Sequence, residues 1–181
     1  PTIKTLESIL PFNLSRSAAP DALPRPAASN RLDQPVGGIV AVAKARGAAR
    51  QLARAFAERE VRKIYVSLVV GRPPRDAGEI SLPIGGKPSS SSYRVLRTEP
   101  SVRFGEVSLI ELSPHTGRTH QLRIHCAEAL GAPMIGDERY GGPSVGAGLF
   151  LWATRLELAD PETRERRAFA APPPPKFERL L

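Results

Sequence analysis

The strongest constraint on the fold is a change of hydrophobic period near residue 60. Over residues 48–58 the apolar positions recur at helical spacing, with arginine and glutamate on the other face, which predicts an amphipathic helix. The next stretch, KIYVSLVVG at 63–71, alternates apolar and polar residues as a strand does. We expect the face that carries Ile64 and Leu68 to lie in the core. The opposite face, with Tyr65, is expected to meet a more polar environment.

Other segments predict further strands. Residues 37–44, GGIVAVAK, are short, apolar and β-branched, which indicates a buried strand. Residues 93–98 and 102–112 predict a hairpin that turns at Glu99 and Pro100. A second hairpin, from 149–158 and 164–172, is closed by Asp160 and Pro161, with proline at a favoured turn position.

Loops and a second helix complete the expected organisation. Residues 20–29 and 83–93 are rich in proline, glycine or serine, and predict an extended loop and a flexible polar loop. Thr119 is expected to cap a helix over residues 119–130 that stops at Gly131. The fold class is therefore α+β, with mostly antiparallel strands and two helices in one domain.

Composition limits the class of protein. The single cysteine excludes a disulfide framework and indicates a reducing compartment, and no apolar stretch approaches the 18 residues that a membrane helix needs. The net charge is +8, and only 5 of the 26 basic residues are lysines. Arginine matches phosphates and stacks on bases, so this bias favours a nucleic-acid partner. A GC-rich genome would raise arginine, alanine and proline together, and composition leaves that explanation open.

All three histidines lie within PHTGRTHQLRIH, residues 114–125, which first suggests a metal site. Their spacing is five and then five: His115, His120 and His125. On a helix this spacing turns successive side chains about 140° apart, and on a strand it puts neighbours on opposite faces. The chain also has no second cluster of histidine or cysteine to complete a ligand shell. We therefore expect no bound metal, and a metal hydrolase is disfavoured.

The same segment is suited to an anion. Arg118, His120 and Arg123 would lie close together on the first turn of the expected helix. A helix N-terminus favours phosphate or carboxylate groups. The alternative is a solvent-exposed basic helix start with no ligand.

A second candidate loop is SNRLDQPVGG, residues 29–38. Asp33 stands at the entrance to the expected buried strand. On local grounds alone, an aspartate at such a position usually forms a turn or a cap.

Four motifs in order, NRLDQPVGG, KIYVSLVVG, HTGRTHQLRIH and PMIGDERYGG, resemble those of the RluA family of RNA pseudouridine synthases. The resemblance runs from about Asn30 to the C-terminus. It implies the pseudouridine synthase catalytic fold, a mostly antiparallel mixed sheet flanked by helices, over residues 30–181. Residues 1–29 are then an N-terminal extension or a remnant of the catalytic domain, whose first strands would be missing.

The resemblance also implies residue roles. Asp33 corresponds to the catalytic aspartate, Tyr65 to the tyrosine that packs on the target uracil, and Arg123 to the arginine that pairs with the catalytic carboxylate. Further residues of the two loops are expected to bind RNA: Asn30, Arg31, Arg118, Thr119, His120 and Gln121. A carboxylate nucleophile needs no cofactor for this isomerisation. The histidines are then hydrogen-bonding supports rather than metal ligands.

The motifs depart from the family pattern at two positions, where Asn30 replaces a histidine and Gly37 replaces a hydroxyl residue. Two hypotheses follow. The first is an active synthase acting on structured RNA such as rRNA. The second is an rRNA-binding factor of ribosome assembly with little or no catalysis. A bacterial cytoplasm and a mitochondrial matrix both suit the composition.

Overall fold

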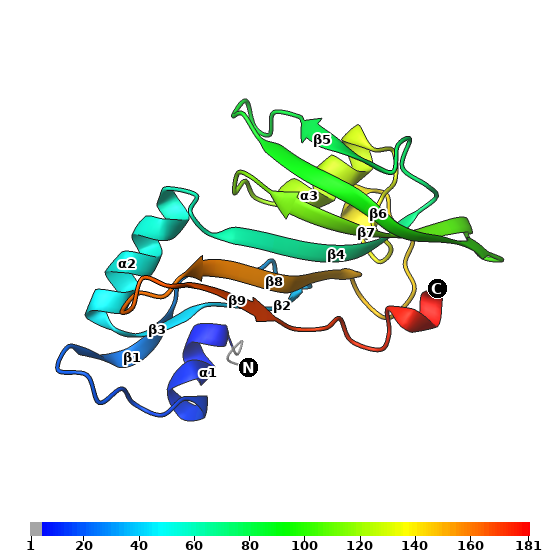
Figure 1. The fold of residues 1–181 in the computed structure, drawn as a ribbon. Coiled ribbons are helices and arrows are strands. Elements are labelled where there is room, and N and C mark those ends of the chain that lie inside the picture. The colour runs from blue at the N-terminus through cyan, green and yellow to red at the C-terminus, as the bar shows by residue number, and fades with distance from the viewer. Residues whose placement is uncertain (1–4) are drawn as a thin grey trace. The chain divides into compact units, whose positions relative to one another are not determined.

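The computed structural model describes residues 5–181 (Figure 1). The chain forms two compact units. The smaller unit comprises the residues up to Leu32 together with Val40–Val61 and Glu157–Ala168. The larger unit comprises Asp33–Ile39, Arg62–Leu156 and Phe169–Leu181. Each unit is described separately.

The smaller unit begins with helix α1, Leu6–Asn13, which a capping box between Thr5 and Ser8 starts. Strand β1, Ala22–Ala28, pairs antiparallel with β3, Val42–Ala45. The expected extended loop at 20–29 is thus largely a strand, and the two prolines within β1, Pro24 and Pro26, fit its extended backbone.

Helix α2, Arg46–Ala57, follows β3 and confirms the helix predicted from the apolar stripe. Leu52 is its buried residue.

The larger unit is built on a seven-stranded sheet, in which six strands have the order β2-β8-β4-β7-β6-β5 and the seventh, β9, pairs with β8. Neighbouring pairs β4-β7, β7-β6 and β6-β5 are antiparallel, and β2 pairs parallel with β8. The strands not yet located are β2 Gly37–Gly38, β4 Arg62–Val70, β5 Ala77–Ser81, β6 Ser90–Ser101, β7 Gly105–Pro114, β8 Leu151–Ala159 and β9 Arg166–Ala170. This mostly antiparallel mixed sheet confirms the expected fold class.

The single strand expected at 37–44 is wrong, because the segment divides between two sheets. β2 joins β8 in the large sheet, and β3 joins β1 in the small one. Close packing explains the short glycine strand: a Cβ atom on Gly37 would overlap the Trp152 ring, and one on Gly38 would overlap the backbone of Ala153. Glycine therefore allows the loop after Asp33 to approach β8 closely.

Strand β4 has core on both faces, so the surroundings of the Tyr65 face are more apolar than expected, although the charge of Asp33 acts on Tyr65. Val66 and Leu68 belong to one buried cluster with Phe150, and Val69 belongs to another. Ser67 is fully buried, and its hydroxyl donates to the Phe150 carbonyl at 2.8 Å. A central strand covered on both faces reads as a continuous apolar run, and Ser67 fits there because its hydroxyl is satisfied.

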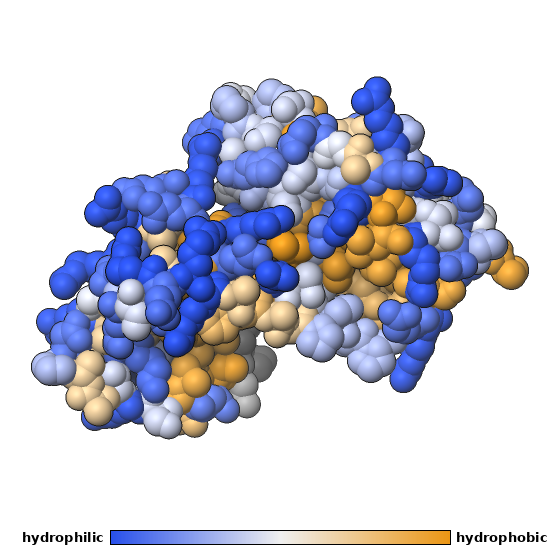
Figure 2. All heavy atoms as spheres, viewed as in Figure 1, coloured by the Kyte–Doolittle hydropathy of each residue, from blue (hydrophilic) through white to orange (hydrophobic). Residues whose placement is uncertain are grey.

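Partly exposed apolar residues pack against the second cluster, the one that contains Phe150 and Phe177. Figure 2 shows apolar side chains reaching the surface of the larger unit beside the C-terminal segment.

The first hairpin is longer than expected and turns elsewhere. Glu99 and Pro100 are paired with Val107 and Glu106, so the turn lies at residues 102–104 instead. Gly105, with φ of +77°, begins the return strand. The second hairpin confirms its prediction, since Asp160 Oδ1 accepts hydrogen bonds from two backbone N–H groups of the turn.

The polar loop expected at 83–93 ends earlier than predicted, because Ser89 and Ser91 are buried. The Ser89 hydroxyl donates to the Leu82 carbonyl, and Ser91 Oγ accepts from Gln121 at 2.9 Å. Serine enters the core here because each hydroxyl has a partner.

The helix expected at 119–130 is irregular. Helix α3, Gln121–Ile124, continues as a π-helical turn, His125–Ala129. Thr119 does not cap it: the preceding residue is His120, in the left-handed conformation and without a side-chain cap. Gly131, at φ of +62°, ends the segment as predicted. The α-helical part has only four residues, so the helix dipole is weak, and the anion site expected there stays a prediction.

Candidate active site

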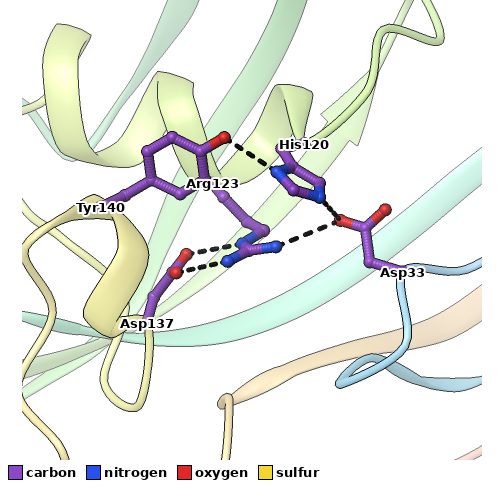
Figure 3. Close-up of polar contacts among 5 residues, drawn as sticks. All are labelled: Asp33, His120, Arg123, Asp137 and Tyr140. Carbon is purple, nitrogen blue, oxygen red and sulfur yellow. Dashed lines mark hydrogen bonds and ion pairs between the residues drawn. The ribbon is translucent and has the colours of Figure 1, made fainter.

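Asp33 lies in a tight turn at the start of the larger unit's first segment, where its carbonyl accepts a hydrogen bond from Val36 N at 2.8 Å. Its side chain is 28% exposed. The turn confirms what the local sequence predicted, and it leaves the carboxylate accessible. The side chain nevertheless has partners that a simple cap would lack (Figure 3).

The first partner is Arg123, whose Nη1 lies 3.6 Å from Asp33 Oδ2. Arg123 is on α3, which contacts β7 of the sheet, and its side chain is only 8% exposed. The pairing of Asp33 with Arg123 that the family resemblance implied is therefore present. At this distance it is an ion pair rather than a direct hydrogen bond.

Arg123 has a closer partner in Asp137. Its Nε and Nη2 donate to the two oxygens of that carboxylate at 2.7 and 2.6 Å. Asp137 is 2% exposed, so this is a buried, two-pronged ion pair. Hydrogen bonding to Asp137 raises the pKa of Arg123, and the charge of Asp33 adds to the effect. Arg123 is accordingly a fixed cation.

His120 is the second partner of Asp33, with Nε2 3.8 Å from the same oxygen, Oδ2. Its Nδ1 shares a hydrogen bond of 2.8 Å with the Tyr140 hydroxyl. The backbone at His120 has φ of +55°, which is costly for a residue with a side chain. The Tyr140 ring also lies 5.0 Å from the Arg123 guanidinium carbon. Tyr140 therefore touches both groups that face Asp33 (Figure 3).

Asp137 and Tyr140 were not predicted as site residues, although both lie in the quoted motif PMIGDERYGG. One signal was available in the sequence: a buried arginine needs a buried counter-charge, and this motif places acidic residues near Arg123 along the chain. Nothing in the spacing identified which of the acidic residues supplies it.

Tyr65 lies on β4, opposite Leu112 of β7, and packs against the core cluster that contains Leu122. Burial raises the pKa of Tyr65 to about 12, with a smaller contribution from the negative charge of Asp33. The phenol is thus neutral at physiological pH. Its electrostatic coupling to Asp33 indicates that the two side chains are near one another.

The remaining predicted RNA-binding residues have varied settings. Arg31 is exposed, and Asn30 Oδ1 accepts a hydrogen bond from Ala41 N within the smaller unit. Thr119 is exposed. Arg118 Nε donates to the Pro88 carbonyl at 3.2 Å. The structure therefore brings together Asp33, His120 and Arg123 in one cluster.

Gln121 has an internal role instead. It is 4% exposed, and its Nε2 donates to Ser90 O and Ser91 Oγ. Its Oε1 accepts from Thr116 Oγ1 and Arg118 N. These four hydrogen bonds use the capacity of the amide, so it holds the loop before α3 rather than reaching toward RNA.

The other two histidines lie in different surroundings. His115 Nε2 is 3.2 Å from Glu79 Oε2 on the surface. His125 is buried and shares a hydrogen bond with Ser89. Within residues 5–181, no group of three or more histidine, cysteine, aspartate or glutamate side chains is placed to hold a metal ion. Over that same range, no helix is long and apolar enough to cross a membrane.

Comparison with known proteins matches the chain to one family. The model of the RNA pseudouridylate synthase family matches residues 5–128. An uncharacterized RNA pseudouridine synthase of Chloroflexus aurantiacus is 37% identical over 174 residues, which cover 87% of this chain and 53% of the relative. The dual-specificity RNA pseudouridine synthase RluA of Pasteurella multocida is 37% identical over 163 residues, covering 80% and 72%.

A solved structure, human RNA pseudouridylate synthase domain containing 1, is 31% identical, with a TM-score of 0.72 over 87% of this chain and 74% of that one. The chain spans about half the length of several curated relatives that it matches. The family model covers more than half of the chain, and relatives named RluA are more than 30% identical to it. The chain therefore belongs to the RNA pseudouridylate synthase family, beside its RluA-type members.

Proposed function

We propose that this chain carries the catalytic centre of an RNA pseudouridine synthase, with Asp33 as its nucleophile. The proposal rests on the surroundings of one accessible carboxylate, that of Asp33. Asp33 Oδ2 faces Arg123 at 3.6 Å and His120 at 3.8 Å. Both side chains face the same oxygen of Asp33, so we propose the other oxygen, Oδ1, as the one that attacks.

The reaction is an isomerisation without a net redox change. The bond from ribose C1′ to uracil N1 breaks, and a bond from C1′ to C5 forms. The C5 hydrogen leaves as a proton, and N1 gains one. A carboxylate serves this reaction because it attacks either C1′ or the uracil ring and later departs with its electron pair, regenerating Asp33.

Two features support the roles of the neighbouring residues. The fixed positive charge of Arg123, beside the attacking group, orients the carboxylate before the substrate arrives. Tyr65 offers a neutral aromatic ring near Asp33, suited to receive a base that has left its stack. These steps need no redox cofactor, because the reaction is an isomerisation.

We propose structured RNA as the substrate, with rRNA as the first candidate. The net charge of +8 and the exposed side chains of Arg31 and Thr119 support an RNA partner. A relative at 32% identity is named ribosomal large subunit pseudouridine synthase C, from Vibrio cholerae.

The alternative is an RNA-binding assembly factor of the same fold with little catalysis. Asn30, in the position of the family's histidine, favours it: its side-chain oxygen is engaged by Ala41 N.

Tritium release from rRNA transcripts that carry [5-³H]uridine separates the two. Wild type should release tritium, because forming the C5 bond expels the C5 hydrogen. Asp33→Asn should release none while binding the transcript equally well. Asp76→Asn is the matched control, since it changes a surface aspartate of the larger unit paired with Arg72. Tight RNA binding by all three proteins with no release from any would favour the assembly factor.

A further inference from the structure

We infer that Asp137 is a positioning residue for the reaction, acting through Arg123. Its carboxylate fixes which nitrogen of the guanidinium faces Asp33, and it holds the arginine back from a closer bond to Asp33. This inference rests on the proposed function.

The first step is the geometry of the shared arginine. Asp137 binds the edge of the guanidinium formed by Nε and Nη2, at 2.7 and 2.6 Å. The nitrogen that faces Asp33 is the remaining one, Nη1, at 3.6 Å. A planar guanidinium held along one edge cannot rotate about its Cζ atom. The direction of Nη1 is therefore set by Asp137.

The second step concerns charge. Arg123 lies between two carboxylates, one 2% exposed and one 28% exposed. Its short hydrogen bonds go to the buried one. Without Asp137, the same cation would be free to form short, charge-assisted hydrogen bonds with Asp33. A two-pronged bond of that kind would also engage Oδ1, the oxygen proposed to attack. Asp137 thus keeps Arg123 from binding Asp33 closely, so Asp33 is oriented and still free to attack.

The third step separates this role from the folding of the loop. The turn that carries Asp137 is held by its backbone: its N–H donates to Met134 O, and its carbonyl accepts from Tyr140 N and Gly142 N. The two side-chain hydrogen bonds of Asp137 both go to Arg123. Asparagine has nearly the same shape, so Asp137→Asn retains the backbone contacts and removes the charge.

The test is a single-turnover measurement of tritium release with the protein in saturating excess over [5-³H]uridine transcript. Under these conditions the rate constant comes from folded, bound protein, so partial unfolding does not lower it. We expect Asp137→Asn to slow release about 100-fold, as displacements of about 1 Å in an active site do, with unchanged RNA affinity. Asp76→Asn is the control, because it removes an aspartate–arginine pair of 2.8 Å on the surface and should react as wild type does.

Arg123→Lys is the second variant, and it decides the outcome if circular dichroism shows that Asp137→Asn does not fold. Lysine keeps the charge but cannot bind Asp137 along one edge and face Asp33 with a fixed nitrogen. It should bind RNA normally and lose turnover by a similar factor.

Wild-type rate constants for a folded Asp137→Asn, or for Arg123→Lys, would overturn the inference and leave the proposed function standing. Absence of release from wild type itself would overturn the proposed function, and the inference would fall with it.

Discussion

The side chains of His120 and Tyr140 are joined by a hydrogen bond of 2.8 Å, and their rings meet edge to face with centroids 5.7 Å apart. This contact fixes the imidazole with Nε2 toward Asp33. It also offsets the cost of the left-handed backbone at His120. A residue in a costly conformation, held by a specific partner, is a feature common at functional sites.

Tyr140→Phe should therefore slow turnover without abolishing it. One hydrogen bond is worth about 0.5–1.5 kcal/mol, which corresponds to roughly a two- to tenfold loss in rate if it acts fully on the reaction. Single-turnover tritium release measures the effect, and Tyr93→Phe, which removes a phenolic hydroxyl on β6, is the control. Equal rates in wild type and Tyr140→Phe would show that the orientation of His120 does not limit the reaction.

Replacement of the neighbouring Gly141 and Gly142 by alanine should have different effects on the protein. A Cβ atom on Gly142 would overlap the carbonyl of Met134 and crowd the Asp137 N–H, so Gly142→Ala must displace the loop that holds Arg123. Gly141 has open space and φ of +81°, so Gly141→Ala should cost only about 1–2 kcal/mol of left-handed strain. Urea unfolding and tritium release together check this: we expect both substitutions to lower stability and Gly142→Ala alone to slow turnover strongly.

Tyr65 should make the stability depend on pH at alkaline values. Its folded-state pKa of about 12 lies above the ordinary value of 10.0, so the folded protein retains the phenolic proton that the unfolded chain loses. This contribution to stability is complete below pH 10 and is lost as pH rises toward 12. By linkage, about 1.4 kcal/mol should disappear between pH 9 and pH 11.

Urea unfolding of wild type and Tyr65→Phe at those two pH values measures the difference. The wild type should lose more stability than the variant over this interval. Parallel losses in the two proteins would mean that the phenol is no more buried than in the unfolded chain.

The thiol of Cys126 should be unreactive in the folded protein. It is fully buried beneath the π-helical turn, and burial raises its pKa above the ordinary range, with the charge of Asp137 adding to the effect. A thiol-specific reagent should label one cysteine per chain in denaturant and almost none in buffer. Rapid labelling of the folded protein would show that this segment opens readily.

Several elements could be predicted from sequence because their signals are local. The apolar stripe of α2, the Asp160 turn and the glycine stop at Gly131 each depend on a few adjacent residues, and all three are confirmed. The wrong predictions have the opposite cause, because they depend on contacts beyond the adjacent residues. Ser67 and Ser89 have polar side chains, yet both are buried, because each hydroxyl donates a hydrogen bond to a main-chain carbonyl.

The candidate site divides in the same way. The order of the motifs, together with the residue types in them, identified Asp33, Tyr65 and Arg123 and the family to which the chain belongs. Their catalytic and RNA-binding roles remain predictions. The division of the chain at residue 30 and its compartment also remain predictions.

By itself, the sequence determined the α+β class and the residue types available for chemistry, since these follow from spacing and order along the chain, and its motifs carried the resemblance to the family. Only the tertiary structure decided which carboxylate binds Arg123 most closely. Asp137 lies fourteen residues beyond Arg123, and the fold of the intervening segment brings the two side chains together. Pairing of buried charges depends on distance and solvent exclusion in three dimensions, and neither quantity is written in the local pattern of residues.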